Sequence, residues 1–217
     1  GDMLRLAVDR PLSISWGGEK ANVKESVVNL TVTNLDLNDW GFLAADLAPK
    51  GIVSASGQIL SQQDGSLMSM DMTAQVRQFS ARLGTNALSM GLIQAQVIGK
   101  LSDLDKAEIQ KLKVEVADGG QSMAMVDAAI NYQIKTGEYS VRATFESRLA
   151  ELLKKYPVAG LQLSAGTAKG SALFTQKAGA QTYVGSVSFS ELTGRYEPYA
   201  LDKYQVTADF DADLKGT

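Results

Sequence analysis

The chain has 217 residues, of which 45% are hydrophobic and 21% are charged, the composition of an ordinary globular protein. Its 21 basic and 24 acidic side chains leave a net charge of −3, which disfavours a nucleic-acid surface. No apolar run reaches the ~20 residues that a membrane-spanning helix needs. Because the sequence contains no histidine and no cysteine, it excludes Ser-His-Asp and Cys-His catalysis, ordinary zinc sites and disulfides.

The first residues already alternate as in a strand, since apolar Leu4, Leu6 and Val8 recur at every second position. The chain begins with Gly1-Asp2-Met3 and shows no signal peptide. We interpret Gly1 as a residue left by cloning. We therefore expect residues 1–217 to be one β-repeat segment cut from a larger protein.

Most of the sequence continues this period-two alternation. The alternating segments are Met68–Val76, Ile93–Leu101, Leu112–Val116, Ala128–Ile134 and Tyr139–Phe145. Turn residues separate them, for example at Asp64-Gly65 and Asp118-Gly119-Gly120. Each segment is typical of a half-buried antiparallel strand, and the short connections favour meanders. The inward positions that we expect to line an apolar groove are Met68, Met70, Met72, Val76, Val97 and Tyr132.

Two short helices are expected among the strands. The first follows Asn38 or Asp39 and ends at Pro49. The second runs from Arg148 to Tyr156, with Ser147 as its N-terminal cap and Pro157 after its end. Lys154 and Lys155 close this helix, where cations complement the helix dipole; a contact with lipid headgroups is the alternative.

An internal repeat connects the two halves of the chain. Residues 57–101 align with residues 170–214 without a gap, at a separation of 113 residues. The apolar phase slips between Val76 and Phe79 in the first copy and between Phe189 and Leu192 in the second. A shared slip predicts a shared β-bulge or strand bend. The pattern indicates a tandem repeat of about 110 residues.

Two motifs admit a metal but favour a structural role. The thioethers of Met68-x-Met70-x-Met72 are soft ligands that suit copper(I), yet their spacing is that of a strand and methionine is a flexible apolar filler. The run Asp209-x-Asp211-x-Asp213 is similar to the start of a calcium loop, but Leu214 stands where such a loop needs glycine. We expect no metal site, no cofactor site and no catalytic residue.

A family resemblance rests on the order of these segments. Val28–Leu37 runs into the first expected helix and is followed by Gly51–Leu60, by long strands and by the near-repeat Gly185–Tyr196. This order resembles the repeat segments of the AsmA-like family, to which TamB and YdbH belong, over most of the chain. The resemblance implies a Gram-negative envelope protein that is anchored in the inner membrane through a segment missing here and has its repeats in the periplasm. It also implies a β-groove that carries phospholipid acyl chains between membranes and supports outer-membrane biogenesis.

The sequence therefore predicts an all-β protein with two short helices, whose curved antiparallel sheets form a groove or an open sandwich. The favoured function is non-catalytic lipid handling, with acyl chains and the remainder of the parent chain as partners and no nucleic acid. The alternative is a structural or adhesive β-repeat module with a closed core. An enzyme that uses an Asp/Glu pair is the least favoured, because nothing in the sequence nominates such a pair.

Overall fold

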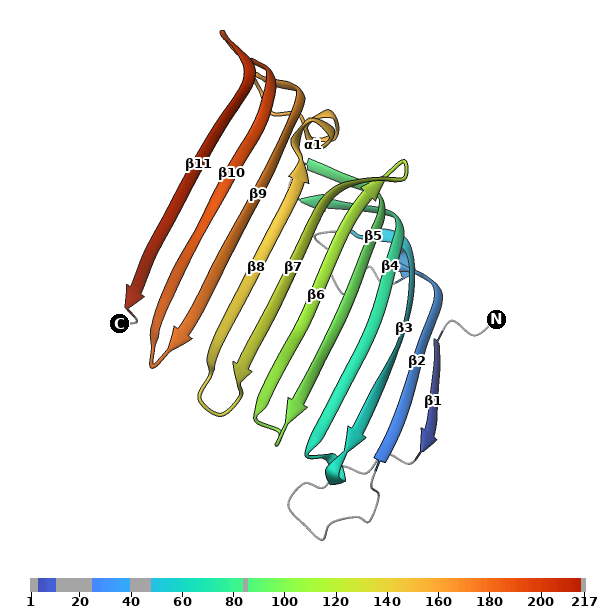
Figure 1. Ribbon diagram of the computed structural model, residues 1–217. Coiled ribbons are helices and arrows are strands. Elements are labelled where there is room, and N and C mark those ends of the chain that lie inside the picture. The colour runs from blue at the N-terminus through green and yellow to red at the C-terminus, as the bar shows by residue number, and fades with distance from the viewer. Residues whose placement is uncertain (1–3, 11–24, 40–47, 84–85, 216–217) are drawn as a thin grey trace.

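All eleven strands belong to one open antiparallel sheet, in which each strand pairs with its neighbours in sequence (Figure 1). The computed structural model describes residues 4–10, 25–39, 48–83 and 86–215. The strands are β1 (Leu4–Arg10), β2 (Glu25–Asp36), β3 (Lys50–Gln62), β4 (Leu67–Leu83), β5 (Asn86–Ser102), β6 (Lys106–Asp118), β7 (Gln121–Gln133), β8 (Glu138–Arg148), β9 (Leu161–Lys177), β10 (Ala180–Tyr196) and β11 (Tyr199–Lys215). The all-β prediction is confirmed. One open sheet takes the place of the sandwich that was one of the expected arrangements.

Tight turns hold this meander together. The β6–β7 connection consists of Gly119 and Gly120, both with positive φ, which is the backbone of a two-residue hairpin turn. Ala178 and Gly179 make the corresponding turn between β9 and β10, also with positive φ at both positions. The short 3-10 segment η2 (Gln63–Gly65) joins β3 to β4 at the predicted Asp64-Gly65 turn. These short connections favour the pairing of consecutive strands, and the longer connections β1–β2, β2–β3 and β8–β9 keep the same order.

The strand registers place apolar residues on one face of the sheet and polar residues on the other. One row of paired residues crosses all eleven strands and is apolar throughout: Leu4, Val32, Ala55, Ala74, Ala95, Val114, Val126, Phe145, Gly170, Val187 and Ala208. The next row is polar throughout: Arg5, Thr31, Ser56, Thr73, Gln96, Lys113, Asp127, Thr144, Ser171, Ser186 and Asp209. We call these two surfaces the apolar face and the polar face. The apolar side chains of these rows therefore stay on the same face of the sheet across all ten strand pairings.

The strands bend near one end of the sheet. Gln78 in β4 and Glu191 in β10 adopt left-handed backbone conformations, with φ of 53° and 54°. Both lie at the predicted phase slips, and they are 113 residues apart in the sequence. Asn34 in β2 and Lys203 in β11 are left-handed as well. Because a left-handed residue in a strand interrupts the pleat, these positions mark where the strands change direction, and β4 and β5 curl strongly at this end (Figure 1).

Helix α1 (Leu149–Lys155) lies at the same end, between β8 and β9 (Figure 1). The predicted N-terminal cap is wrong by one residue. Arg148 is the cap, and no side chain caps the helix by a hydrogen bond. Ser147 lies one residue before the cap and pairs in β8 with Ala124 and Ala168. The other predicted helix falls on residues 40–47, which lie outside the described residues.

Few hydrophobic side chains are fully buried. Within the described residues they are Ala81, Met123, Ala150 and Ala168, which come from β4, β7, α1 and β9. Helix α1 packs mainly on β9, with smaller contacts to β7 and β8. The fully buried hydrophobic side chains therefore gather at the end that carries α1, while Ser26 and Ser61, each 2% exposed, are buried at the opposite end.

Candidate functional site

The six predicted groove residues all lie on the apolar face. Met68, Met70, Met72 and Val76 project from β4, and Met72 pairs directly with Val97 of β5. Tyr132 of β7 shares a row of paired residues with Met68, through Leu101 and Ala107. The apolar face thus brings these side chains together across four adjacent strands. All are half-buried except Tyr132, which is exposed.

Glycines that the sequence pattern did not single out shape this face. A Cβ placed on Gly57 would lie 2.6 Å from Cγ of Met72, and one on Gly99 would lie 3.1 Å from Cε of Met70. On the other half of the sheet, the ring of Phe145 covers Gly170 and the ring of Phe210 covers Gly185. Large side chains therefore lie flat over glycines of the neighbouring strand, which keeps the face smooth. Only the register, and not the local alternation, could reveal these pairs.

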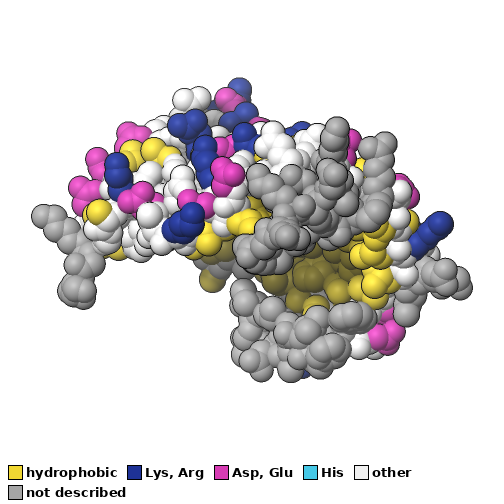
Figure 2. Space-filling view, turned by 90° about the horizontal axis from the view of Figure 1, so that it is seen from below, with side chains coloured by type: hydrophobic (Ala, Val, Ile, Leu, Met, Phe, Trp, Pro, Cys, Tyr) yellow, Lys and Arg dark blue, Asp and Glu magenta, His cyan; other side chains and the backbone are white. Residues whose placement is uncertain are grey.

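Much of the apolar face is accessible to solvent. Val126, Phe145 and Phe210 in its middle and C-terminal parts are between 38% and 40% exposed. Figure 2 views the sheet from the end opposite α1, and hydrophobic side chains there line a hollow on the side of the N-terminal strands. Contiguous exposed apolar surface of this extent is typical of a binding site for another apolar molecule.

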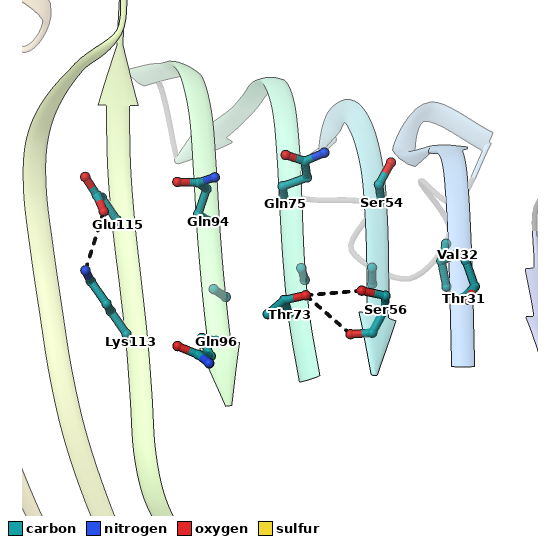
Figure 3. Close-up of a pocket in the computed structure, with 13 residues that line it drawn as sticks. Thr31, Val32, Ser54, Ser56, Thr73, Gln75, Gln94, Gln96, Lys113 and Glu115 are labelled. Atoms are coloured by element: carbon teal, nitrogen blue, oxygen red, sulfur yellow. Dashed lines mark hydrogen bonds and ion pairs between the residues drawn. The ribbon is translucent and has the colours of Figure 1, made fainter. Parts of the chain in front are cut away.

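The polar face carries a shallow depression of about 500 Å³ over β2 to β6 (Figure 3). Its side chains are mainly hydroxyls and amides, and Ser56 and Thr73 share a hydrogen bond of 3.2 Å. Lys113 and Glu115 form an ion pair at 3.7 Å. Figure 3 shows Gln75 and Gln94 projecting from neighbouring strands toward the same side. The depression is thus a polar, open surface of hydroxyls, amides and one ion pair.

The other candidate motifs have structural surroundings. Asp209 and Asp211 lie on the polar face of β11, and the described residues contain no group of three or more Asp, Glu, His or Cys that could hold a metal ion. Lys154 pairs with Glu151 at 2.8 Å, and Lys155 pairs with Asp118 at 2.6 Å. Both lysines at the end of α1 are thus engaged within the chain.

Glu108 is the titratable group with the clearest perturbation. Its carboxylate accepts a hydrogen bond from Lys100, with Nζ and Oε2 2.7 Å apart, and a second from Lys106. These hydrogen bonds, that of Lys100 first, lower the pKa of Glu108 below its ordinary value of 4.5. Because the folded value is lower than the unfolded one, the stabilisation is present above pH 4.5 and is lost as the pH falls through the folded value.

We expect Glu108→Gln to lower the urea midpoint at neutral pH. The difference in urea midpoint between Glu108→Gln and the unsubstituted chain should shrink on acidification. It should vanish once Glu108 is protonated in the folded state. Urea titrations along a descending pH series measure this. Glu197→Gln is the control, since that side chain makes none of the described ion pairs or hydrogen bonds. A difference that stays constant down to acid pH contradicts the assignment.

No helix of the described chain has the length and apolar character needed to cross a membrane. No protein-family model, no curated protein and no solved structure matches the chain. The candidate site therefore rests on the physical chemistry of the sheet itself.

Proposed function

We propose that the apolar face binds lipid acyl chains and that the chain is a non-catalytic, lipid-handling segment. The observation that carries this proposal is the row of apolar residues that runs from Leu4 to Ala208 across every strand, in which Leu4, Val126, Phe145 and Ala208 are exposed and the others are half-buried. A closed core would bury such a face, whereas here the described residues leave it uncovered. An apolar surface of this size is costly in water unless a ligand covers it.

The side chains of the face suit acyl chains. Its β4 and β5 portion combines flexible methionines with Ala74, Ala95 and Val97, a smooth lining that adapts to a mobile ligand. Burial of a methylene group contributes ~0.8 kcal/mol at best, so a chain of a dozen methylenes that is only partly covered still gains several kcal/mol. No polar side chain interrupts the row across the eleven strands, which favours a hydrocarbon ligand over a sugar or a nucleotide.

The resemblance to AsmA-like repeats extends the proposal to the cell envelope. The parent protein would lie in the periplasm of a Gram-negative bacterium, anchored in the inner membrane, and would pass phospholipids toward the outer membrane. This location and this partner depend on the resemblance and not on the geometry of the sheet.

The internal repeat has partial support from the strand registers. Met72 pairs with Val97, and Gly185 pairs with Phe210, residues that lie 113 positions later in the chain. The hairpins β4–β5 and β10–β11 therefore share one register. The hairpins β3–β4 and β9–β10 differ in register. Gly57 pairs with Met72, whereas Gly170 pairs with Val187 and not with Gly185, the counterpart of Met72. A repeat that includes β3 and β9 needs a two-residue difference in the connecting turn.

The test is site-specific photo-crosslinking in the full-length parent, with neighbouring residues as controls. A photoreactive side chain at Met70, Val97 or Tyr132 should label phospholipid, because these positions lie on the apolar face. The same side chain at Asp71 or Gln96 should not, because these positions lie on the polar face. Equal labelling on both faces, or none above background at the inward positions, contradicts the proposal and favours a structural or adhesive module.

A further inference from the structure

The apolar face ends in polar side chains on its C-terminal half, at the end of the sheet opposite α1 (Figure 1). The row of paired residues that lies six positions along the strands from Val126 and Phe145 carries a hydroxyl or an amide on each strand from β7 to β10. We call these four side chains the polar rim: Tyr132, Tyr139, Gln176 and Gln181. Ser26 and Ser61 continue the row on β2 and β3, but each is 2% exposed, so the accessible polar groups of the row lie on β7 to β10.

A chain of hydrogen bonds holds the two glutamines of the polar rim in place. The hydroxyl of Tyr183 donates to Oε1 of Gln181 at 2.8 Å. Nε2 of Gln181 donates to Oε1 of Gln176 at 3.0 Å, and Nε2 of Gln176 donates to the backbone oxygen of Gly137 at 3.4 Å. Both amides are therefore oriented on the apolar face before any ligand arrives.

The polar rim keeps hydrogen-bond donors to spare. Each of the two amides uses one of its two N–H groups in these bonds. The hydroxyls of Tyr132 and Tyr139 take part in none of the hydrogen bonds between described residues. Tyr132 is 39% exposed and the other three side chains are half-buried, so a ligand on the apolar face can reach them. Neutral donors of this kind suit a ligand oxygen that accepts hydrogen bonds.

Tyrosine rings mark the boundary between the apolar face and the polar rim. The ring of Tyr183 packs edge-on against Phe174, with ring centroids 5.4 Å apart, while its hydroxyl reaches Gln181. Tyr132 and Tyr139 stand beside it, so three of the seven tyrosines of the chain gather at this level. Tyrosine is enriched where hydrocarbon meets water, because its ring is apolar and its hydroxyl polar. The polar rim thus has the composition of such a boundary.

The length of the apolar surface beside the polar rim fits an acyl chain. Tyr139 lies six residues from Phe145 on β8, which is about 20 Å along a strand. The hydrocarbon core of a bilayer is about 30 Å thick and holds two layers of acyl chains, so one layer is about 15 Å deep. The side chains in between on the apolar face of β8 and β9 are Val141, Ala143, Ala172 and Phe174. An acyl chain that lies along these strands meets hydrocarbon over its whole length.

We propose that the polar rim binds the ester oxygens of a glycerolipid whose acyl chain lies along β7 to β10 toward Phe145. This inference rests on the proposed function and adds the position and direction of the lipid. The ester oxygens accept hydrogen bonds from the spare N–H and O–H groups, which replace the water that the lipid loses. Because the polar rim holds no charged side chain, it recognises the ester region that glycerolipids share and not the charge of one headgroup.

The first experiment tests the direction of the lipid. Two photoreactive phosphatidylcholines are presented in vesicles, one with a diazirine on the headgroup and one with a diazirine at the methyl end of an acyl chain. Mass spectrometry of the labelled peptides should place the headgroup probe around Tyr139 and Gln176. The chain-end probe should appear around Phe145 and Gly170, with about a tenfold preference in each case. The same pattern from both probes, or the reverse pattern, overturns the inference while the acyl-chain site stands. If neither probe labels the apolar face, the proposed function fails as well.

The second experiment tests the donors of the polar rim. Gln176→Leu combined with Gln181→Leu should weaken binding of a fluorescent monoacylglycerol about tenfold, since two amide donors are lost. Binding of the same fluorescent chain with a methyl group in place of the glycerol ester should be unchanged or tighter. An equal loss for both ligands, or no loss for the monoacylglycerol, overturns the inference.

Gln75→Leu combined with Gln96→Leu is the matched control, because these two half-buried glutamines lie on the polar face. This control should bind both ligands as the unsubstituted chain does. Urea midpoints establish that the variants are folded. If the rim variant does not fold, Tyr132→Phe combined with Tyr139→Phe removes donors without changing the rings, and it should weaken binding of the monoacylglycerol alone.

Discussion

Val97→Asp should strongly weaken acyl-chain binding and leave the sheet folded. Val97 lies in the middle of the apolar face, paired with Met72 on one side and Leu112 on the other, and it is half-buried. In the free protein, solvent still reaches a carboxylate at this position, so the cost to folding should be about 1–2 kcal/mol. A bound acyl chain would cover that carboxylate and remove its water, which should weaken lipid binding about 100-fold.

Gln96→Asp is the matched control, because it adds the same charge one residue away on the opposite face. Binding of a fluorescent fatty acid and the urea midpoint are measured for both variants. The proposal predicts a large loss of binding for Val97→Asp and almost none for Gln96→Asp. A similar loss in both variants would point to a general effect of charge and contradict a ligand site on one face.

Gly194→Ala should be among the most destabilising single substitutions in the chain. Gly194 has a φ of 149°, a conformation that residues with a Cβ rarely adopt. A Cβ there would lie 2.1 Å from the backbone oxygen of Gln162 and 2.8 Å from Cα of Leu163, and backbone atoms of a paired strand cannot move aside cheaply. We expect a loss of about 3 kcal/mol or more in the free energy of unfolding.

Gly179→Ala separates the two causes. Gly179 also has a positive φ, of 80°, but a Cβ there would meet nothing within 4 Å. Its replacement should cost about 1 kcal/mol, the penalty of a left-handed alanine alone. Chemical denaturation of both variants measures the difference. Equal destabilisation would show that the contact with Gln162 and Leu163 is relieved by a local shift.

The period-two pattern predicted the strands from Met68 to Phe145, the turns between several of them and the two faces. This succeeded because side-chain direction in a strand depends only on position along it, and because short turns favour the pairing of consecutive strands. The phase slips also predicted the bends, since a left-handed residue such as Gln78 shifts the alternation by one position.

Sequence reasoning failed where distant segments meet. Nothing local marks Tyr156 as the partner of Ser89, because the hydroxyl binds backbone atoms that every residue has. The single open sheet was equally hidden, since an inward apolar position is the same residue type whether protein or ligand covers it. Ser147 was predicted to cap helix α1 because its hydroxyl suits that role. The helix begins one residue later, and Ser147 pairs with Ala124 in β8.

The order of the strands has a thermodynamic consequence. Each strand packs almost only on the strands before and after it. The stability of a strand therefore depends mainly on its two neighbours. The outer strands β1 and β11 each have one neighbour and should fray first, so amide protons there exchange with solvent sooner than those of central strands. Local opening should therefore start at the two edges of the sheet, while the central strands open only in global unfolding. Under mechanical load, an outer strand can detach while the central strands keep their structure.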